Sequence, residues 1–249
     1  MAWVETASLS FAARHDSGIA EEAAAMLADL EEFRTDMEDL FDIVPGDVAV
    51  VIHPRPLMMN FAAPWLPLAR MVSAPAGRRY FAGFFGAREI HVLAPTALEK
   101  RASDVPGSRE ALMRTPRHEY AHVVVGANNA TLPPPFSPAT FRRYARSAWL
   151  CEGAASHLAG QVPLMRAAVA RRLREGRRPS FPPASRDALV LGGTVFEMLA
   201  EEQGPEACAE LARAPDTRSP RRSIEEAFGR PGASVERDWS SYLASLTAG

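Results

Sequence analysis

The amino-acid sequence predicts an α+β fold, in which a small N-terminal mixed sheet with an edge strand precedes a mainly helical C-terminal half. Two observations support this class. Short β-branched and aromatic runs, which favour strands, all lie before Ala97. After Ala97, apolar positions recur at intervals of three and four, the spacing of amphipathic helices. Strands followed by helices are typical of α+β proteins rather than of alternating doubly wound sheets.

The N-terminal half contains several strand signals and one long helix signal. Strand-like runs occupy four segments, namely 8–15, 48–53, 79–86 and 89–95. Residues 18–43 place apolar side chains three and four apart, with acids on the other face, which predicts an amphipathic helix. The segment 54–79 is rich in proline and apolar residues, and it fits either a loop packed on the sheet or a mobile flap.

The C-terminal half reads as a series of helices separated by proline-rich loops. The expected helices are 108–126, 142–160, 163–175, 187–203, 205–213, 223–229 and 234–246, with loops at 131–138 and 176–186. Pro116 predicts that the first helix restarts there, with Thr115 as N-cap and Pro116 at the first helical position. Ser223 and Glu226 have the spacing of a capping box at the start of a later helix.

The composition is that of an ordinary globular protein. Its 28 basic and 30 acidic residues give a net charge of −2, so charge offers no reason to expect nucleic acid or an anionic membrane as partner. Neither a secretory leader nor an apolar run of the roughly 18–20 residues that span a bilayer is present. Cys151 and Cys208 are too few for a disulfide framework. We therefore expect a cytoplasmic protein, and the oligomeric state stays open.

The stretch RHEYAHVVVG at 117–126 contains a potential metal site. Histidines at i and i+4 lie on one helix face with Cβ atoms about 5–6 Å apart, so His118 and His122 can bind one ion. Glu119 lies about 100° round the helix and can reach a metal-bound water without being a ligand. The alternative is a pair of solvated histidines, but the apolar residues around them predict an interior helix.

A third ligand candidate follows in the segment SAWLCEGAASHLAG at 147–160. Glu152 is the one acid in this apolar helix, and a buried carboxylate is costly unless it is paired or ligated. The small residues after it would allow close packing against the first helix. The extended motif with a third histidine is absent, because Val125 and Asn128 stand at its glycine and histidine positions. Two histidines and one glutamate leave a fourth position open, as in catalytic zinc sites.

The combination of HEYAH at 118–122 and WLCEGAA at 149–155 resembles the gluzincin metallopeptidases, whose third ligand is a glutamate on a following helix. The resemblance extends at the level of pattern to the small bacterial peptidases called minigluzincins and covers most of the chain. It implies that His118, His122 and Glu152 bind zinc. Glu119 would be the general base that activates the metal-bound water for hydrolysis of a peptide bond.

The resemblance also implies an architecture and a substrate. Residues 1–249 would form a single catalytic unit of compact zincin-like fold, with a sheet-containing subdomain at 1–107 and a helical subdomain at 108–249 that carries the metal site. The segment GAREIHVLAP at 86–95 is similar to the edge strand on which these enzymes pair an extended peptide. A peptide or protein substrate is therefore expected.

Some residues depart from the pattern of this family. Many relatives carry an oxyanion-stabilising tyrosine before the glycines of the segment that here reads LVLGGTVF, where this chain has Leu189, Val190 and Leu191. Tyr144 and His157 are the candidate substitutes, and the alternative for Tyr144 is an aromatic side chain on the surface. This departure leaves an alternative open: a catalytically weak or inactive zinc-binding module that binds a peptide or partner protein. A helical protein without any site is the third possibility.

The remaining candidates are interpreted as structural. Ser156 is one turn after Glu152, within reach of a zinc-bound histidine that its hydroxyl would orient less firmly than a carboxylate, whereas His157 is expected to be a structural histidine. His53 and His91 are interpreted as packing or surface groups, and Cys151 as a buried thiol. The basic run at 171–178 is expected to be a solvated helix end.

Overall fold

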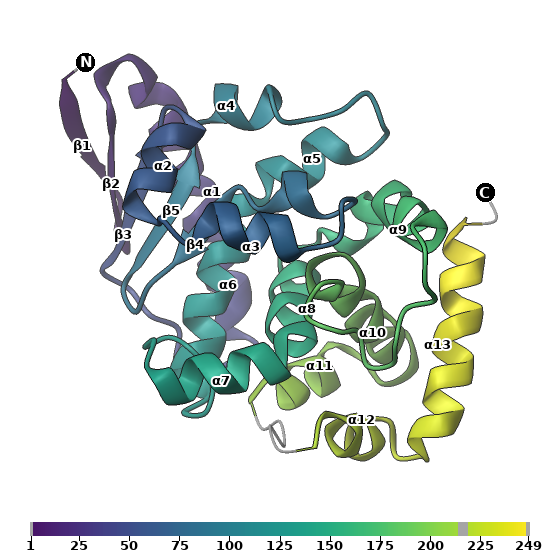
Figure 1. The fold of residues 1–249 in the computed structure, drawn as a ribbon. Coiled ribbons are helices and arrows are strands. Elements are labelled where there is room, and N and C mark those ends of the chain that lie inside the picture. Colours follow the sequence, from purple (N-terminus) through teal and green to yellow (C-terminus); the bar gives the residue numbers. More distant parts are fainter. Residues whose placement is uncertain (1, 214–218, 248–249) are drawn as a thin grey trace.

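Five strands form one mixed sheet in the computed structural model, which describes residues 2–213 and 219–247 (Figure 1). The strands are β1 (Trp3–Ala7), β2 (Phe11–Asp16), β3 (Val48–His53), β4 (Gly83–Phe85) and β5 (Glu89–Leu93). They are ordered β1-β2-β3-β5-β4. The three central strands β2, β3 and β5 are parallel, and the two edge strands pair antiparallel to their neighbours.

Helices make up most of the rest of the described chain, which confirms the α+β class. They are α1 (Ala20–Glu38), α2 (Pro56–Ala62), α3 (Leu66–Val72), α4 (Pro95–Glu99), α5 (Ser108–Met113), α6 (Thr115–Asn128), α7 (Pro138–Arg146), α8 (Ala148–Leu158), α9 (Arg166–Arg174), α10 (Ala188–Gln203), α11 (Pro205–Arg213), α12 (Pro220–Phe228) and α13 (Gly232–Thr247). No described helix is long and apolar enough to cross a membrane. One hydrophobic core joins the sheet, α1 and the C-terminal helices.

The strand predictions are confirmed in position but not in pairing. Strand β1 was not predicted, and the chain from 79 to 86 forms only the short strand β4, because Arg78–Tyr80 is a 3-10 turn. The prediction that the segment 86–95 forms the edge strand is wrong. Its strand β5 is internal, because His91 is paired with Val51 on one side and with Phe84 on the other. The free edge on this side belongs to β4.

The two faces of the sheet differ in what covers them. Alternate residues such as Val50 and Ile90 join α1 and α6 in the main core. The opposite face carries His53 and His91, whose Nε2 and Nδ1 atoms are 2.9 Å apart, and Phe84 stacks on His91 at 4.1 Å. Burial and the neighbouring His91 lower the pKa of His53 to about 4, so it is neutral at pH 7. The packing role predicted for both histidines is confirmed.

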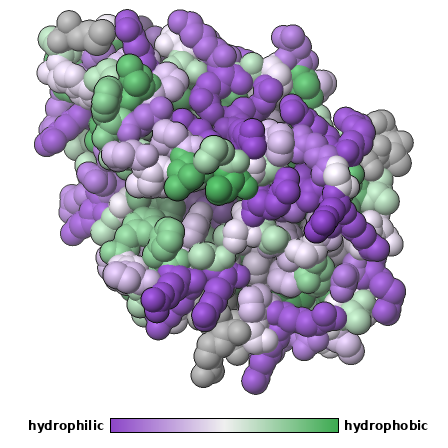
Figure 2. Space-filling view, in the orientation of Figure 1, coloured by the Kyte–Doolittle hydropathy of each residue, from purple (hydrophilic) through white to green (hydrophobic). Residues whose placement is uncertain are grey.

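The segment 54–79 contains two short helices where a loop was expected, and it packs on the sheet as the first interpretation requires. Its movement as a flap stays a prediction. Each of α2 and α3 has a proline in its first turn, where a missing N–H costs nothing. Met59 and Leu66 pack against Leu93 at the end of the sheet in a second, smaller core. Large apolar side chains are exposed on the outer face of both helices. In Figure 2, a group of green, hydrophobic residues lies over α3.

The helix ends also differ from prediction. The restart at Pro116 is confirmed, but the helix begins one residue earlier, with Arg114 as N-cap and Thr115 already helical. The predicted capping box is wrong, because α12 begins at Pro220 and Ser223 therefore lies inside it. The helix predicted over 142–160 is two helices, since α7 ends at Arg146 and α8 begins at Ala148.

Helix α10 is the centre of the helical half, and two features fix its position. At its crossing with α8, a Cβ added to Gly153 would lie 2.6 Å from the carbonyl carbon of Gly192, so the glycines allow backbone contact. The small residue Gly153 therefore faces α10 and not α6. At its start, Asp187 accepts a bidentate ion pair from Arg172 of α9, with one N–O distance of 2.7 Å. Arg172 is buried, so the run 171–178 is not wholly solvated as predicted.

The glycine crossing yields a stability prediction. We expect Gly153→Ala to lower the free energy of unfolding by about 1–3 kcal/mol, because the added methyl group meets backbone that cannot yield. Chemical denaturation measures the change. Gly46→Ala is the matched control, since a Cβ there would lie 3.8 Å from the Cβ of Ser10, an ordinary contact. Equal losses in the two variants would contradict the close approach of α8 and α10.

Candidate metal centre

Helices α6 and α8 bring three potential ligands together in the interior. His118 and His122 lie one turn apart on α6, and Glu152 lies on α8, which packs beside α6. The three residues are 5%, 3% and 6% exposed. Their ligand atoms all lie within 4.8 Å of one another. The sequence-predicted ligands therefore converge, and together they can hold a metal ion.

The spacing of the ligand atoms fits a tetrahedral ion. The Nε2 atoms of His118 and His122 are 3.2 Å apart. The Glu152 oxygens lie 3.4 Å from Nε2 of His118 and 3.7 Å from Nε2 of His122. Bond lengths of about 2.0–2.1 Å at tetrahedral angles put neighbouring ligand atoms roughly 3.3–3.4 Å apart. The group therefore needs only small side-chain adjustments to bind such an ion.

The protonation states also suit a metal site. Burial lowers the pKa of His122 to about 3, and His118 adds to this effect against the opposing charge of Glu152. Burial raises the pKa of the Glu152 carboxyl, but His122, His118 and Tyr144 outweigh it and bring the pKa to about 2. Burial lowers the pKa of His118, whereas Glu152, Glu119 and Gln161 raise it to above the ordinary value. A bound ion would displace that proton.

Gln161, which the sequence analysis did not single out, orients His118. Its Nε2 donates to the carbonyl oxygen of Ala111 at 2.8 Å, so its Oε1 is free to accept from Nδ1–H of His118 at 2.9 Å. This bond fixes the tautomer that leaves the Nε2 lone pair of His118 facing Glu152. Ser156, the residue that the sequence put within reach of this role, does not have it, because its buried hydroxyl has no hydrogen-bond partner in the described chain.

Glu119 lies beside the ligands under the edge strand β4. It is 6% exposed, and no hydrogen bond to its carboxyl occurs within residues 2–213 and 219–247. A Cβ added to Gly83 of β4 would lie 2.6 Å from Oε1 of Glu119, so only glycine fits above it. Burial raises the pKa of Glu119 to about 8; His118 opposes this and Glu152 adds to it. The side chain is therefore placed to exchange protons near neutral pH.

Tyr144 reaches the same centre from α7. Its hydroxyl donates to Oε1 of Glu152 at 2.6 Å, and burial together with the charge of Glu152 raises its pKa well above the usual range. Leu189 of α10 also lines the cavity but has no hydroxyl, so the phenol enters from a different helix, α7. The catalytic role predicted for Tyr144 stays a prediction.

A cavity of about 430 Å³ opens over the three ligands and Glu119. Phe85 of β4 also lines this cavity and stacks on the His122 ring at 4.1 Å. Within the described chain, the charged or titrating side chains in its lining are those of the centre and two tyrosines. Apart from Ser73 and Ser185, the remaining wall is apolar and comes largely from α3, α7 and the loop before α7, with Trp65, Leu68, Val72, Phe136, Phe141 and Leu189.

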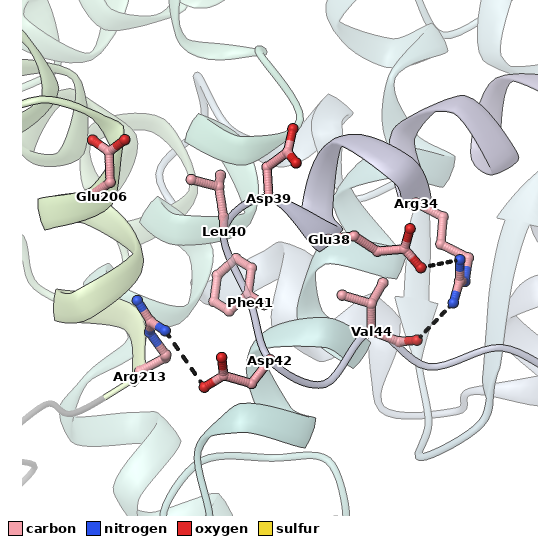
Figure 3. A pocket seen from close by; sticks show the side chains of 9 residues that line it. All are labelled: Arg34, Glu38, Asp39, Leu40, Phe41, Asp42, Val44, Glu206 and Arg213. Atoms are coloured by element: carbon pink, nitrogen blue, oxygen red, sulfur yellow. Dashed lines mark hydrogen bonds and ion pairs between the residues drawn. The ribbon is translucent and has the colours of Figure 1, made fainter.

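Other candidates lie outside this centre. Nδ1 of His157 is 3.0 Å from Oε2 of Glu197, which agrees with a structural role, and Cys151 is a buried free thiol as predicted. A second cavity of about 500 Å³ lies at the end of α1, where Arg213 pairs with Asp42 (Figure 3). Among the described residues, the group His118, His122 and Glu152 is the one cluster with metal-binding spacing.

Comparison of the chain with known protein families, with curated proteins and with solved structures finds no match. The description of the centre therefore depends on its own geometry. Its elements are a buried His-His-Glu group, a glutamate beside it and a phenol bonded to one ligand.

The bond between Gln161 and His118 yields a metal-binding prediction. We expect Gln161→Leu to weaken Zn²⁺ and Co²⁺ binding by about 10–100-fold, because the imidazole loses the acceptor that orients it. Competition with a coloured chelator measures the affinity. Gln161→Glu keeps an acceptor for Nδ1–H and should retain more affinity than the leucine variant. His157→Gln, outside the ligand group, is the control; a loss of affinity there as large as in Gln161→Leu would contradict the assignment.

Proposed function

We propose that the chain is a zinc-dependent metallopeptidase that hydrolyses peptide bonds. The observation that carries the proposal is the buried group of His118, His122 and Glu152, with the unbonded carboxyl of Glu119 beside it. All four line one largely apolar cavity, to which the edge strand β4 also contributes. The resemblance of HEYAH and WLCEGAA to the gluzincins points to the same chemistry.

Zinc is the ion that suits this donor set best. Two imidazole nitrogens and one carboxylate, at distances close to a tetrahedral arrangement, match three-ligand zinc sites. A zinc ion bound there would act as a Lewis acid and lower the pKa of a coordinated water to about 7 in good cases. The neutral form of His122 and the ionised form of Glu152 are the forms that bind.

Glu119 would move the proton in this reaction. As a general base it accepts the proton of the attacking water, and as an acid it returns that proton to the leaving amine. Its raised pKa, near 8 through burial, supports such exchange at neutral pH. Tyr144 would stabilise the developing oxyanion through its hydroxyl, after a shift of its present hydrogen bond away from Glu152.

The edge strand β4 supports a peptide as the substrate. One of its sides pairs with β5, and the other is the free edge of the sheet. An extended peptide can add to such an edge through main-chain hydrogen bonds. Gly83 and Phe85 of β4 contact Glu119 and His122, so a peptide on this edge would pass directly over the centre.

The second candidate is a zinc-binding module of the same kind that is catalytically weak or inactive and binds a peptide or partner protein. Two observations favour it. Leu189 offers no hydrogen-bond donor to the cavity, and the Tyr144 hydroxyl is engaged by Glu152. A cytoplasmic location and the absence of nucleic acid among the partners remain expectations from the sequence.

Glu119→Gln separates peptide hydrolysis from metal binding. We expect the variant to bind zinc as the wild type does, because Glu119 is not in the ligand group, and to lose peptide hydrolysis by at least about 100-fold. Cleavage of a diverse peptide library, followed by mass spectrometry, measures the activity. His118→Ala should lose both the ion and the activity. Cleavage that persists unchanged in Glu119→Gln would sink the proposed mechanism.

Tyr144→Phe distinguishes the two candidate functions. If Tyr144 stabilises the oxyanion, removal of its hydroxyl lowers kcat by about 10²–10³ while KM changes little. Phe141→Leu, on the same helix and at the same cavity, is the matched control and should act mainly on KM. A wild-type protein that binds zinc and peptides but cleaves none of them would favour the inactive module.

A further inference from the structure

The outer face of α2 and α3 is the largest gathering of exposed apolar side chains in the described chain. Of the thirteen large hydrophobic side chains that are exposed, six lie between residues 57 and 72. They are Leu57, Phe61, Trp65, Leu68, Met71 and Val72, with exposures of 53–77%. We call these six the α2–α3 patch. Exposed apolar groups gathered in this way mark an interaction surface rather than ordinary scatter.

The polar groups inside the patch do not interrupt it. Asn60 and Arg70 are the polar side chains between Pro56 and Val72, and they bond each other at 2.9 Å. Arg70 also donates to the carbonyl oxygen of Phe81. Their hydrogen-bonding capacity is therefore largely used within the protein, and the outward surface presents mainly hydrocarbon.

The rim of the patch is positively charged. Residues 48–88 contain five arginines and no aspartate or glutamate, although the whole chain has a net charge of −2. Arg55 precedes α2, and Arg78 bonds the carbonyl oxygen of Met71 at the end of α3. Arg79 follows Arg78 in the chain; burial, the charge of Arg70 and the charge of Arg79 together lower the pKa of Arg101 to about 10. Within the described chain, no salt bridge neutralises Arg55, Arg78 or Arg79.

We propose that the α2–α3 patch binds the surface of an anionic lipid membrane. The apolar side chains would enter the boundary between headgroups and acyl chains, and the flanking arginines would meet lipid phosphates. Helices of seven residues cannot span a bilayer, so the protein would lie on its surface. No membrane partner was expected from the sequence because the net charge of the whole chain is near neutral. That total conceals the local excess of positive charge in residues 48–88.

A second copy of the chain fits the patch less well. In a two-fold dimer the same surface meets itself, so the unneutralised arginines on one rim would approach those of the other copy. Like charges placed opposite each other are unfavourable, whereas a phosphate surface complements both the apolar centre and the basic rim. The proposal does not depend on the peptidase chemistry of the metal centre.

Vesicle flotation tests the proposal directly. We expect the full chain to float with vesicles of phosphatidylcholine and phosphatidylglycerol, to float less with phosphatidylcholine alone, and to be released by salt. The combined change Leu57→Ser, Phe61→Ser and Met71→Ser should lower partitioning at least about tenfold. Arg55→Gln should lower it about fivefold on the anionic vesicles. These side chains do not line the cavity over the metal centre.

The matched control changes three exposed apolar side chains elsewhere, namely Leu9→Ser, Ile43→Ser and Val105→Ser. It should float as the wild type does, and circular dichroism and zinc content verify that both triple variants are folded. Tryptophan emission provides a second readout: Trp65 should shift to the blue on anionic vesicles, and the shift should disappear in Trp65→Phe. No flotation of the wild type, or equal flotation of both triple variants, overturns the proposal. A dimer that only the patch variant dissociates, without lipid binding, also overturns it.

Discussion

The burial of one carboxylate and two imidazoles between packed helices is the constraint on which the rest of the structure depends. An isolated charge in such a place is costly unless it is paired or ligated. Two Nε2 atoms only 3.2 Å apart need a shared proton or a cation between them. Glu152 supplies the negative charge that makes a cation favourable there. A bound ion would therefore stabilise the fold as well as provide reactivity.

The surroundings of this group hold it in place from several elements. The crossing at Gly153 and Gly192 fixes α8 against α10, so the carboxyl of Glu152 approaches α6 from a rigid support. Gln161 follows α8 and ties His118 to the backbone of α5 through Ala111. A neutral amide orients an imidazole without adding a second buried negative charge. This choice suits a centre that already contains Glu119 and Glu152.

The sequence was informative where structure is local and uninformative where it depends on tertiary packing. The ligands at 118 and 122 are fixed by helix geometry, and Glu152 was conspicuous as an acid in an apolar helix. The internal position of β5 could not be predicted, because strand order depends on pairing partners far apart in the sequence. Gln161 gave no signal, since an isolated glutamine has no spacing pattern. In 54–79, the frequent prolines masked two short helices that they begin.

The helices α2 and α3 connect the metal centre to the outside of the molecule. Trp65, Leu68 and Val72 line the cavity, and the same side chains belong to the exposed α2–α3 patch. An apolar wall excludes water and lowers the local dielectric, which strengthens every charge interaction at the centre. A membrane surface that covers this wall would lower the local dielectric further. It would also bring apolar peptide segments close to the mouth of the cavity. Membrane contact and chemistry would then share one structural element, although each is tested by different side chains.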